Sequence, residues 1–167
     1  MTGIRLEDDS AAPASQQAGH FINLVDGASI SHFTISSYGD GDSGFPLISG
    51  NGSLAAGEII GHGVVNVTGT IDSVNLKTAD KAVIAASSIR QCTIRAAGGV
   101  TAVAGDIELD DGLGGVLVHQ ASLFGPGTAI WKCAGDGLFE AQFAGDRMLL
   151  HTSGTGGLFA VSCKSVA

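Results

Sequence analysis

The six-residue stretch Ile89–Ile94 (Ile-Arg-Gln-Cys-Thr-Ile) decides the fold, because versions of it return along the whole chain. Counted from its first residue as position 0, it carries apolar or small residues at 0, +3 and +5, with mostly polar or small residues between them. The +3/+5 pair has the two-residue period of a strand with one buried face, and the step from 0 to +3 leaves room for a corner. The clearest other copies are Ile30–Ile35, Ile71–Leu76, Leu138–Phe143 and Leu158–Cys163.

An alignment on position 0 predicts eight rungs that recur every 15 to 24 residues. Their anchors are Ile30, Leu54, Ile71, Ile89, Ile107, Leu123, Leu138 and Leu158. Six positions upstream, a further apolar residue predicts a second strand per coil, at Leu24, Ile48, Val65, Val83 and Leu117. A repeated coil of about 18 residues that holds two or three short strands predicts an all-β solenoid, a short parallel β-helix of about eight rungs.

The repeat covers a single domain, residues 19–167, which we expect to follow an extended N-terminal arm of residues 1–18. The arm lacks the repeat, and a segment of its composition is usually mobile when left free. We expect either the body of the same chain or a neighbouring subunit to hold it. The structural alternative is an antiparallel sandwich or jelly roll with hairpins at Asn51–Gly52 and Asp111–Gly112. We favour the β-helix, because a sandwich gives no reason for the 0/+3/+5 pattern to recur.

Composition and charge exclude several classes of function. The chain has 26 glycines, only 5% aromatic residues and no glycine-free stretch with helical spacing, which suits short strands and tight corners. A formal net charge of −8 predicts no nucleic-acid partner and no anionic membrane partner. The N-terminus is not a signal peptide and no run is long enough to span a bilayer, so we expect synthesis in a cytoplasm without export.

The rung patterns of Ile30–Ile35 and Ile89–Ile94 resemble those of right-handed parallel β-helix proteins, the pectin-lyase-like superfamily, over residues 22–163. That superfamily contains pectin-degrading enzymes, bacteriophage tailspikes and other virion appendages. The short, acidic chain is most similar to a bacteriophage virion appendage or decoration protein. The resemblance implies a non-enzymatic structural protein localised in a phage-like virion, as a head decoration, head fibre or tail-associated spike.

The same resemblance implies a homo-oligomer, with a trimer favoured, that contacts other virion structural proteins through its N-terminal arm. A terminal rung close to the C-terminus, Leu158–Cys163, supports assembly, because an uncovered strand edge invites further pairing. The first alternative is a carbohydrate-recognising adhesin or tailspike fragment. The second is a polysaccharide-cleaving enzyme.

Charged residues offer candidates for that enzyme chemistry. Glycoside hydrolysis needs two nearby carboxyl groups, and the densest acidic group is Asp106, Glu108, Asp110 and Asp111. We interpret this group as a solvated edge that keeps the protein soluble. Lyase chemistry would need basic residues. Arg90 and Arg95 share a rung, but we expect no Lys or Arg at the matching positions of adjacent rungs.

Aromatic and metal-ligating residues are the remaining candidates for a binding site. Trp131–Lys132 and Tyr38 could contact a sugar, but core or subunit packing is the favoured interpretation for Trp131. Asp40–Gly44 has the start of a calcium loop without its later glutamate, and we interpret it as a corner. Cys92 and Cys163 occupy core positions, so the three cysteines (Cys92, Cys133 and Cys163) are interpreted as buried hydrophobes. His20, His32, His62, His119 and His151 lack metal-ligand spacing. We therefore predict no catalytic residue, metal site or cofactor.

Overall fold

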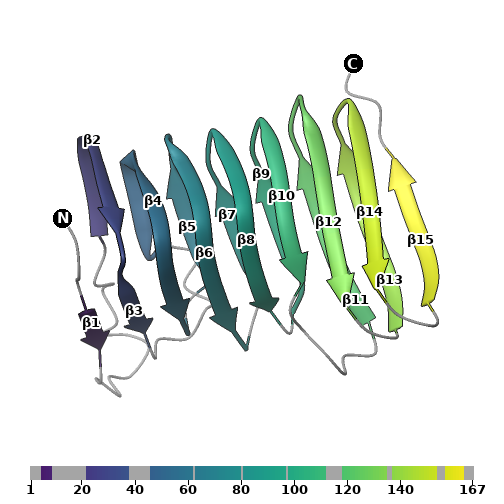
Figure 1. The fold of residues 1–167 in the computed structure, drawn as a ribbon, viewed down its shortest axis with the longest axis horizontal. Coiled ribbons are helices and arrows are strands. Elements are labelled where there is room, and N and C mark those ends of the chain that lie inside the picture. Colours follow the sequence, from purple (N-terminus) through teal and green to yellow (C-terminus); the bar gives the residue numbers. More distant parts are fainter. Residues whose placement is uncertain are drawn as a thin grey trace.

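The chain folds as an all-β parallel solenoid, as the sequence predicts (Figure 1). This computed structural model describes residues 5–8, 22–37, 46–61, 63–79, 81–96, 98–111, 118–134, 137–153 and 157–163. Within these ranges the chain forms fifteen strands and no helix. The strands are β1 (Arg5–Asp8), β2 (Ile22–Ser31), β3 (Thr34–Ser37), β4 (Ile48–Ile60), β5 (Val64–Val67), β6 (Thr70–Thr78), β7 (Ala82–Ala85), β8 (Ser88–Ala96), β9 (Val100–Val103), β10 (Asp106–Asp111), β11 (Val118–Phe124), β12 (Thr128–Ala134), β13 (Gly137–Ala144), β14 (Arg147–Ser153) and β15 (Gly157–Cys163).

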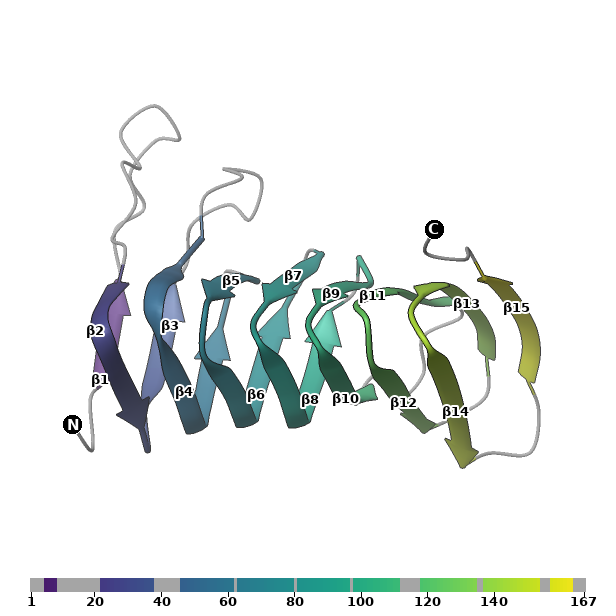
Figure 2. The same cartoon turned by 90° about the horizontal axis from the view of Figure 1, so that it is seen from above.

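The strands stack in two columns. The even column runs from β4 through β6, β8, β10 and β12 to β14, and the odd column from β5 through β7, β9, β11 and β13 to β15. The long strand β4 joins the two columns, since its first residues pair with β5 and its last with β6. Figure 2 shows the odd column along one side of the rod and the even column along the other. From β5 onward, one odd and one even strand make up each coil, whereas β4 spans both columns by itself.

In the first half of the rod the chain turns at position +2, between β2 and β3 and within β4, β6 and β8, where it takes a left-handed conformation. His32, Ala56, Ser73 and Gln91 have φ values of 54°, 50°, 55° and 49°. Their neighbours are in register from coil to coil, with Leu54 opposite Ile71 and Ile71 opposite Ile89. Side chains rarely adopt this conformation, and a single such residue redirects the strand. The corner expected between positions 0 and +3 is confirmed.

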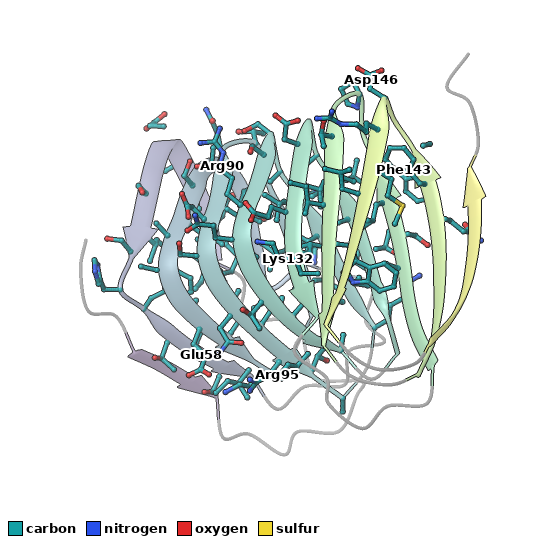
Figure 3. All side chains as sticks on the ribbon, turned by 45° about the vertical axis from the view of Figure 1, so that its right-hand side comes forward. Glu58, Arg90, Arg95, Lys132, Phe143 and Asp146 are labelled. Carbon is teal, nitrogen blue, oxygen red and sulfur yellow. The ribbon has the colours of Figure 1, made fainter. Side chains whose placement is uncertain are left out.

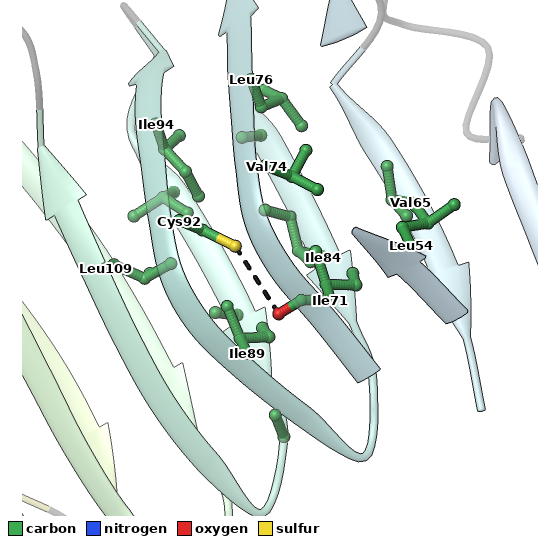
Figure 4. Close-up of a cluster of buried hydrophobic side chains, with 14 of the residues drawn as sticks. Leu54, Val65, Ile71, Val74, Leu76, Ile84, Ile89, Cys92, Ile94 and Leu109 are labelled. Atoms are coloured by element: carbon green, nitrogen blue, oxygen red, sulfur yellow. Dashed lines mark hydrogen bonds between the residues drawn. The ribbon is translucent and has the colours of Figure 1, made fainter. Parts of the chain in front are cut away.

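The core forms columns of equivalent residues from successive coils. Position 0 is buried in the first five rungs, and so are the residues at +3 and +5 of the rungs that start at Ile71 and Ile89. Figure 4 shows several of these side chains, among them Ile71, Ile89 and Ile94, in one buried cluster. They leave a cavity of about 10 Å³ lined by Leu54, Ile59, Val65, Ile71, Val74, Leu76, Ile84, Cys92 and Ile94. That volume is at the lower limit for one water molecule, and its apolar lining offers a ligand no polar anchor.

The eight-rung alignment is wrong in its last three members. Ile107 pairs with Ala129 and Ala129 with Met148, so these two residues continue the even column. Leu123, Leu138 and Leu158 instead belong to strands of the odd column, β11, β13 and β15. The rod therefore has fewer coils than eight. The error arose because odd strands also alternate apolar and polar residues, and this alternation imitates the +3/+5 spacing.

The upstream strand is also out of phase in two of the described coils. Leu24 lies opposite Gly50, two residues from the predicted match with Ile48, and Val83 is one residue from the true position. Val65 pairs with Ile84, which is 3% exposed, whereas Val83 is 37% exposed. The strand exists as predicted, but Val83 lies on its outward face. A shift of one residue exchanges the two faces of a strand, so an apolar residue on either side of the true position gives a similar sequence pattern.

The antiparallel alternative is excluded for the described residues, because every strand pair among them is parallel. Asn51–Gly52 lies inside β4 rather than in a hairpin. Asp111 ends β10, and Gly112 lies outside the described residues.

Part of the expected N-terminal arm lies against the rod. Strand β1 pairs in parallel with β3, with Arg5 opposite Thr34 and Leu6 opposite Ile35. It therefore covers the β3 edge of the first coil. The remainder of the segment expected as an arm, residues 1–4 and 9–18, lies outside the described residues.

The packing of Gly57 gives a test of the core. A Cβ at Gly57 would lie 2.3 Å from Phe33 Cε1, because the Phe33 ring occupies the space that a side chain would fill. We expect Gly57→Ala to lower the free energy of unfolding by about 1–3 kcal/mol, as overpacked cores do. Thermal and urea unfolding followed by circular dichroism measure the change.

Phe33→Leu supplies the matched control. The double variant with Gly57→Ala should lose clearly less free energy of unfolding than the two single variants lose together, because the smaller Leu side chain makes room for the new methyl group. Strict additivity would contradict this packing.

Candidate functional surface

The acidic group around β10 is engaged with the next coil. The Thr128 N–H donates a hydrogen bond to Asp106 Oδ1 at 3.0 Å, and Lys132 Nζ forms an ion pair with Glu108 Oε1 at 2.5 Å. Asp110 lies opposite Thr93 and Lys132 in the strand register. The side chains of Asp110 and Asp111 lie outside the described part of the structure. The two carboxylates that are described thus connect coils of the same chain.

Other polar side chains make the same kind of connection. Lys77 Nζ lies 2.6 Å from Glu58 Oε1 in the preceding coil. The Thr70 N–H donates to Ser53 Oγ at 3.0 Å, at the position equivalent to the bond between Thr128 and Asp106. These groups are partly or fully exposed, so each contact by itself contributes little to the free energy of unfolding. Their shared role is to fix one coil on the next.

The basic residues are arranged differently from what the sequence predicted. Arg95 lies opposite Lys77 in the register of β8 and β6, so the expectation that no basic residue matches it on an adjacent rung is wrong. The corner at Gln91 separates Arg90 from Arg95, and Figure 3 shows them toward opposite ends of the even strand. Arg90 lies opposite Asp72 instead. The match was missed because Arg95 and Lys77 lie at +6, beyond the repeating pattern.

Trp131 is part of the core. It is 1% exposed, and its strand register places it opposite Leu109 and Leu150. A buried indole gives a sugar ring no platform to lie on. The favoured interpretation of Trp131 as a packing residue is confirmed, and Tyr38 lies outside the described residues.

Cys92 is also a core residue, as predicted. It is 2% exposed, and its Sγ contacts the carbonyl oxygens of Arg90 at 3.2 Å and Ile71 at 3.7 Å (Figure 4). Burial raises the pKa of the thiol from 9.0 to about 11, although backbone hydrogen bonds oppose the shift. The thiolate that a nucleophile or metal ligand requires is therefore disfavoured. The side chains of Cys133 and Cys163 lie outside the described part.

Within the described residues, no three His, Cys, Asp or Glu side chains are grouped closely enough to hold a metal ion. Strands β11 and β14, which contain His119 and His151, belong to different columns. The Asp40–Gly44 segment, His20 and His62 lie outside the described residues. The described part also contains no helix with the length and hydrophobicity needed to cross a membrane.

The sequence reasoning missed an uncharged face on the odd column. Outward residues alternate with the buried ones along β4, β5, β7, β9, β11 and β13, and their register places them in two adjacent rows. Among the described side chains, these rows contain no Asp, Glu, Lys or Arg. The uncharged face consists of Ser49, Val64, Asn66, Val83, Ala85, Thr101, Val103, Ser122, Phe124, Gln142 and Ala144.

The two sides of the even column differ from this face. Before the corner, the outward residues include Asp72, Arg90 and Glu108. Beyond the corner they include Glu58, Lys77, Arg95 and Lys132. A sequence search for charged motifs could not find the uncharged face, because what defines it is which residues share a side of the rod.

Comparisons of the chain with protein-family models, with curated proteins and with solved structures find no match.

The buried thiol predicts a dependence of stability on pH. The unfolded thiol loses its proton near pH 9 and the folded one near pH 11, so its contribution to stability is complete below pH 9 and is lost as the pH rises through 11. We expect the stability of the wild type relative to Cys92→Ala to fall by roughly 2–3 kcal/mol across this window. Urea unfolding of both proteins from pH 8 to 11 measures the difference, and a constant difference would contradict the prediction.

Proposed function

We propose that this chain is a non-enzymatic structural protein that acts through assembly contacts as a homo-oligomer. The observation that carries the proposal is the use of its surface carboxylates. Asp106, Glu108 and Glu58 each connect one coil to a neighbouring coil of the same chain. A glycosidase acid needs a free path to its substrate, whereas each of these three carboxylates is already engaged by a lysine side chain or a backbone N–H of the same chain.

The setting we propose is a phage-like virion, as a head decoration, head fibre or tail-associated spike. The similarity of the rung pattern to virion appendages supports this setting. The rod geometry adds a physical reason, because β14 and β15 have one strand neighbour each among the described residues. A strand edge at the end of a solenoid suits attachment to another protein.

Carbohydrate recognition is the second candidate. The observation in its favour is the adjacent pair Lys77 and Arg95, which could meet an acidic sugar. The ion pair between Lys77 and Glu58 weakens that argument, and the burial of Trp131 removes one aromatic platform. A polysaccharide-cleaving enzyme stays a weaker proposal.

The Asp106 side chain separates the structural role from the enzymatic one. We expect Asp106→Ala to lower the free energy of unfolding by about 1 kcal/mol, because the Thr128 N–H loses its acceptor. Asp106→Asn keeps an oxygen acceptor and should cost less. Asp146→Ala is the matched control, an exposed corner residue that should change stability little.

The same proteins are assayed for release of reducing or unsaturated sugar ends from a panel of polysaccharides. No release is expected from the wild type. Release by the wild type that disappears in Asp106→Asn would contradict the structural proposal and support a polysaccharide-cleaving enzyme.

The N-terminal segment tests attachment. A chain that begins at residue 19 should keep the circular dichroism of the rod but melt at a lower temperature, because β3 loses its neighbour β1. If the segment also contacts the virion, the shortened chain should no longer sediment with particles from cells that express it. Undiminished co-sedimentation with the particles would contradict attachment through this segment.

A further inference from the structure

We propose that the uncharged face packs against the same face of a second copy of this chain. This inference rests on the proposed function as an assembly protein and assigns the surface through which copies meet. Two of its residues, Val83 and Val103, are 37% and 45% exposed, and they are two of the four large apolar side chains that are exposed among the described residues. They lie in neighbouring strands, with Val103 opposite Ala85 and Thr101 opposite Val83.

Charge points to a second copy as the occupant. Each chain has a formal net charge of −8, so two copies repel one another over most of their surface. The uncharged face is where two copies can approach without bringing like charges together. A strongly basic partner would gain most from the acidic side chains elsewhere on the rod and would gain nothing from this face.

The shape of the face fits such a pair. Two sheets pack face to face ~10 Å apart when small and medium apolar side chains fill the space between them. The outward valine and alanine residues of β5, β7 and β9 supply such a surface. These three strands lie along one side of the rod (Figure 2). Charged residues flank it, with exposed Lys81 before β7 and exposed Asp106 after β9. An apolar centre with a polar rim is the usual arrangement of a protein interface.

The size of the face predicts a weak contact. Six strands ~4.8 Å apart and about four residues of ~3.3 Å each give a projected area of roughly 300 Å² per copy. A stable interface buries about 800 Å² per partner, so we expect a pair that forms at high concentration or within an assembly. A face-to-face pair also suits one flat surface better than a trimer does, because each trimer subunit needs two contact surfaces.

Sedimentation equilibrium of the full chain tests the proposal. The wild type should show a mass that rises with concentration from 16.7 kDa toward twice that value. Sodium chloride should strengthen association by screening the repulsion between copies. If the copies met through oppositely charged side chains instead, the salt would weaken their association.

Val103→Glu and Leu149→Glu form a matched pair of variants. Their wild-type side chains are 45% and 46% exposed, and each change adds one negative charge, but only Val103 lies on the uncharged face. Val103→Glu should raise the dissociation constant of the pair at least tenfold, and Leu149→Glu should change that constant less than twofold. Circular dichroism checks that both variants fold.

Three results would overturn the pairing: equal weakening by the two variants, weakening by salt, or a monomer at every concentration up to the millimolar range. A limiting mass of three copies would likewise exclude the face-to-face pair. A monomer at every concentration would also contradict the homo-oligomer of the proposed function, whereas the other results leave that function untouched, and its non-enzymatic role fails only if the chain cleaves polysaccharide.

Discussion

Hydrogen bonding between coils is the interaction on which this structure depends. In a parallel solenoid, the backbone of each strand finds its partners in the coil before and the coil after. The bonding continues through the corners, where the Ser87 N–H donates to the Gly69 carbonyl and the Gly105 N–H to that of Ser87. A coil with a different number of residues must therefore correct its length locally. Strand β10 does so with an irregularity between Ile107 and Leu109, where the left-handed corner residue of β8 has no counterpart.

The sequence predicted the fold class and the first five position-0 residues because the apolar pattern and the corner coincide there. It failed from Leu123 onward because alternation alone does not distinguish an even strand from an odd one. A better signal was present two positions before the anchor. Gly69, Gly105 and Gly127 stand at −2 before Ile71, Ile107 and Ala129, and their backbones form one hydrogen-bonded corner row. Small corner residues were therefore the stronger guide to the phase as far as Ala129, whereas Asp146 holds this position in the last coil.

The candidate surface was harder to predict than the fold. Burial of Cys92 and Trp131 could be inferred, because core positions follow from periodicity. The partners of Asp106 and Glu108 could not, since Thr128 and Lys132 lie more than twenty residues away and only the true register places them alongside. The uncharged face depends on register in the same way. It becomes visible when outward residues from six strands are seen to share one side of the rod.

Charge and packing together explain why the two columns have different roles. The even column carries the ion pairs that connect coils, and the odd column carries small apolar and uncharged polar residues on its outward side. A rod of this kind keeps its own coils together on one side and leaves the other suited to contact with another subunit. Both assignments depend on the strand register within each column.

Disulfide trapping tests that register most directly. In the structure Ser122 lies opposite Gln142, so Ser122→Cys with Gln142→Cys places the two Cα atoms ~4.8 Å apart, within the range of a disulfide. If Leu123 and Leu138 were equivalent anchors, Ser122 would lie opposite Gly137 instead. We expect rapid intramolecular oxidation of the first pair and none for Ser122→Cys with Gly137→Cys, as identified by peptide mapping. Trapping of the second pair in place of the first would contradict it.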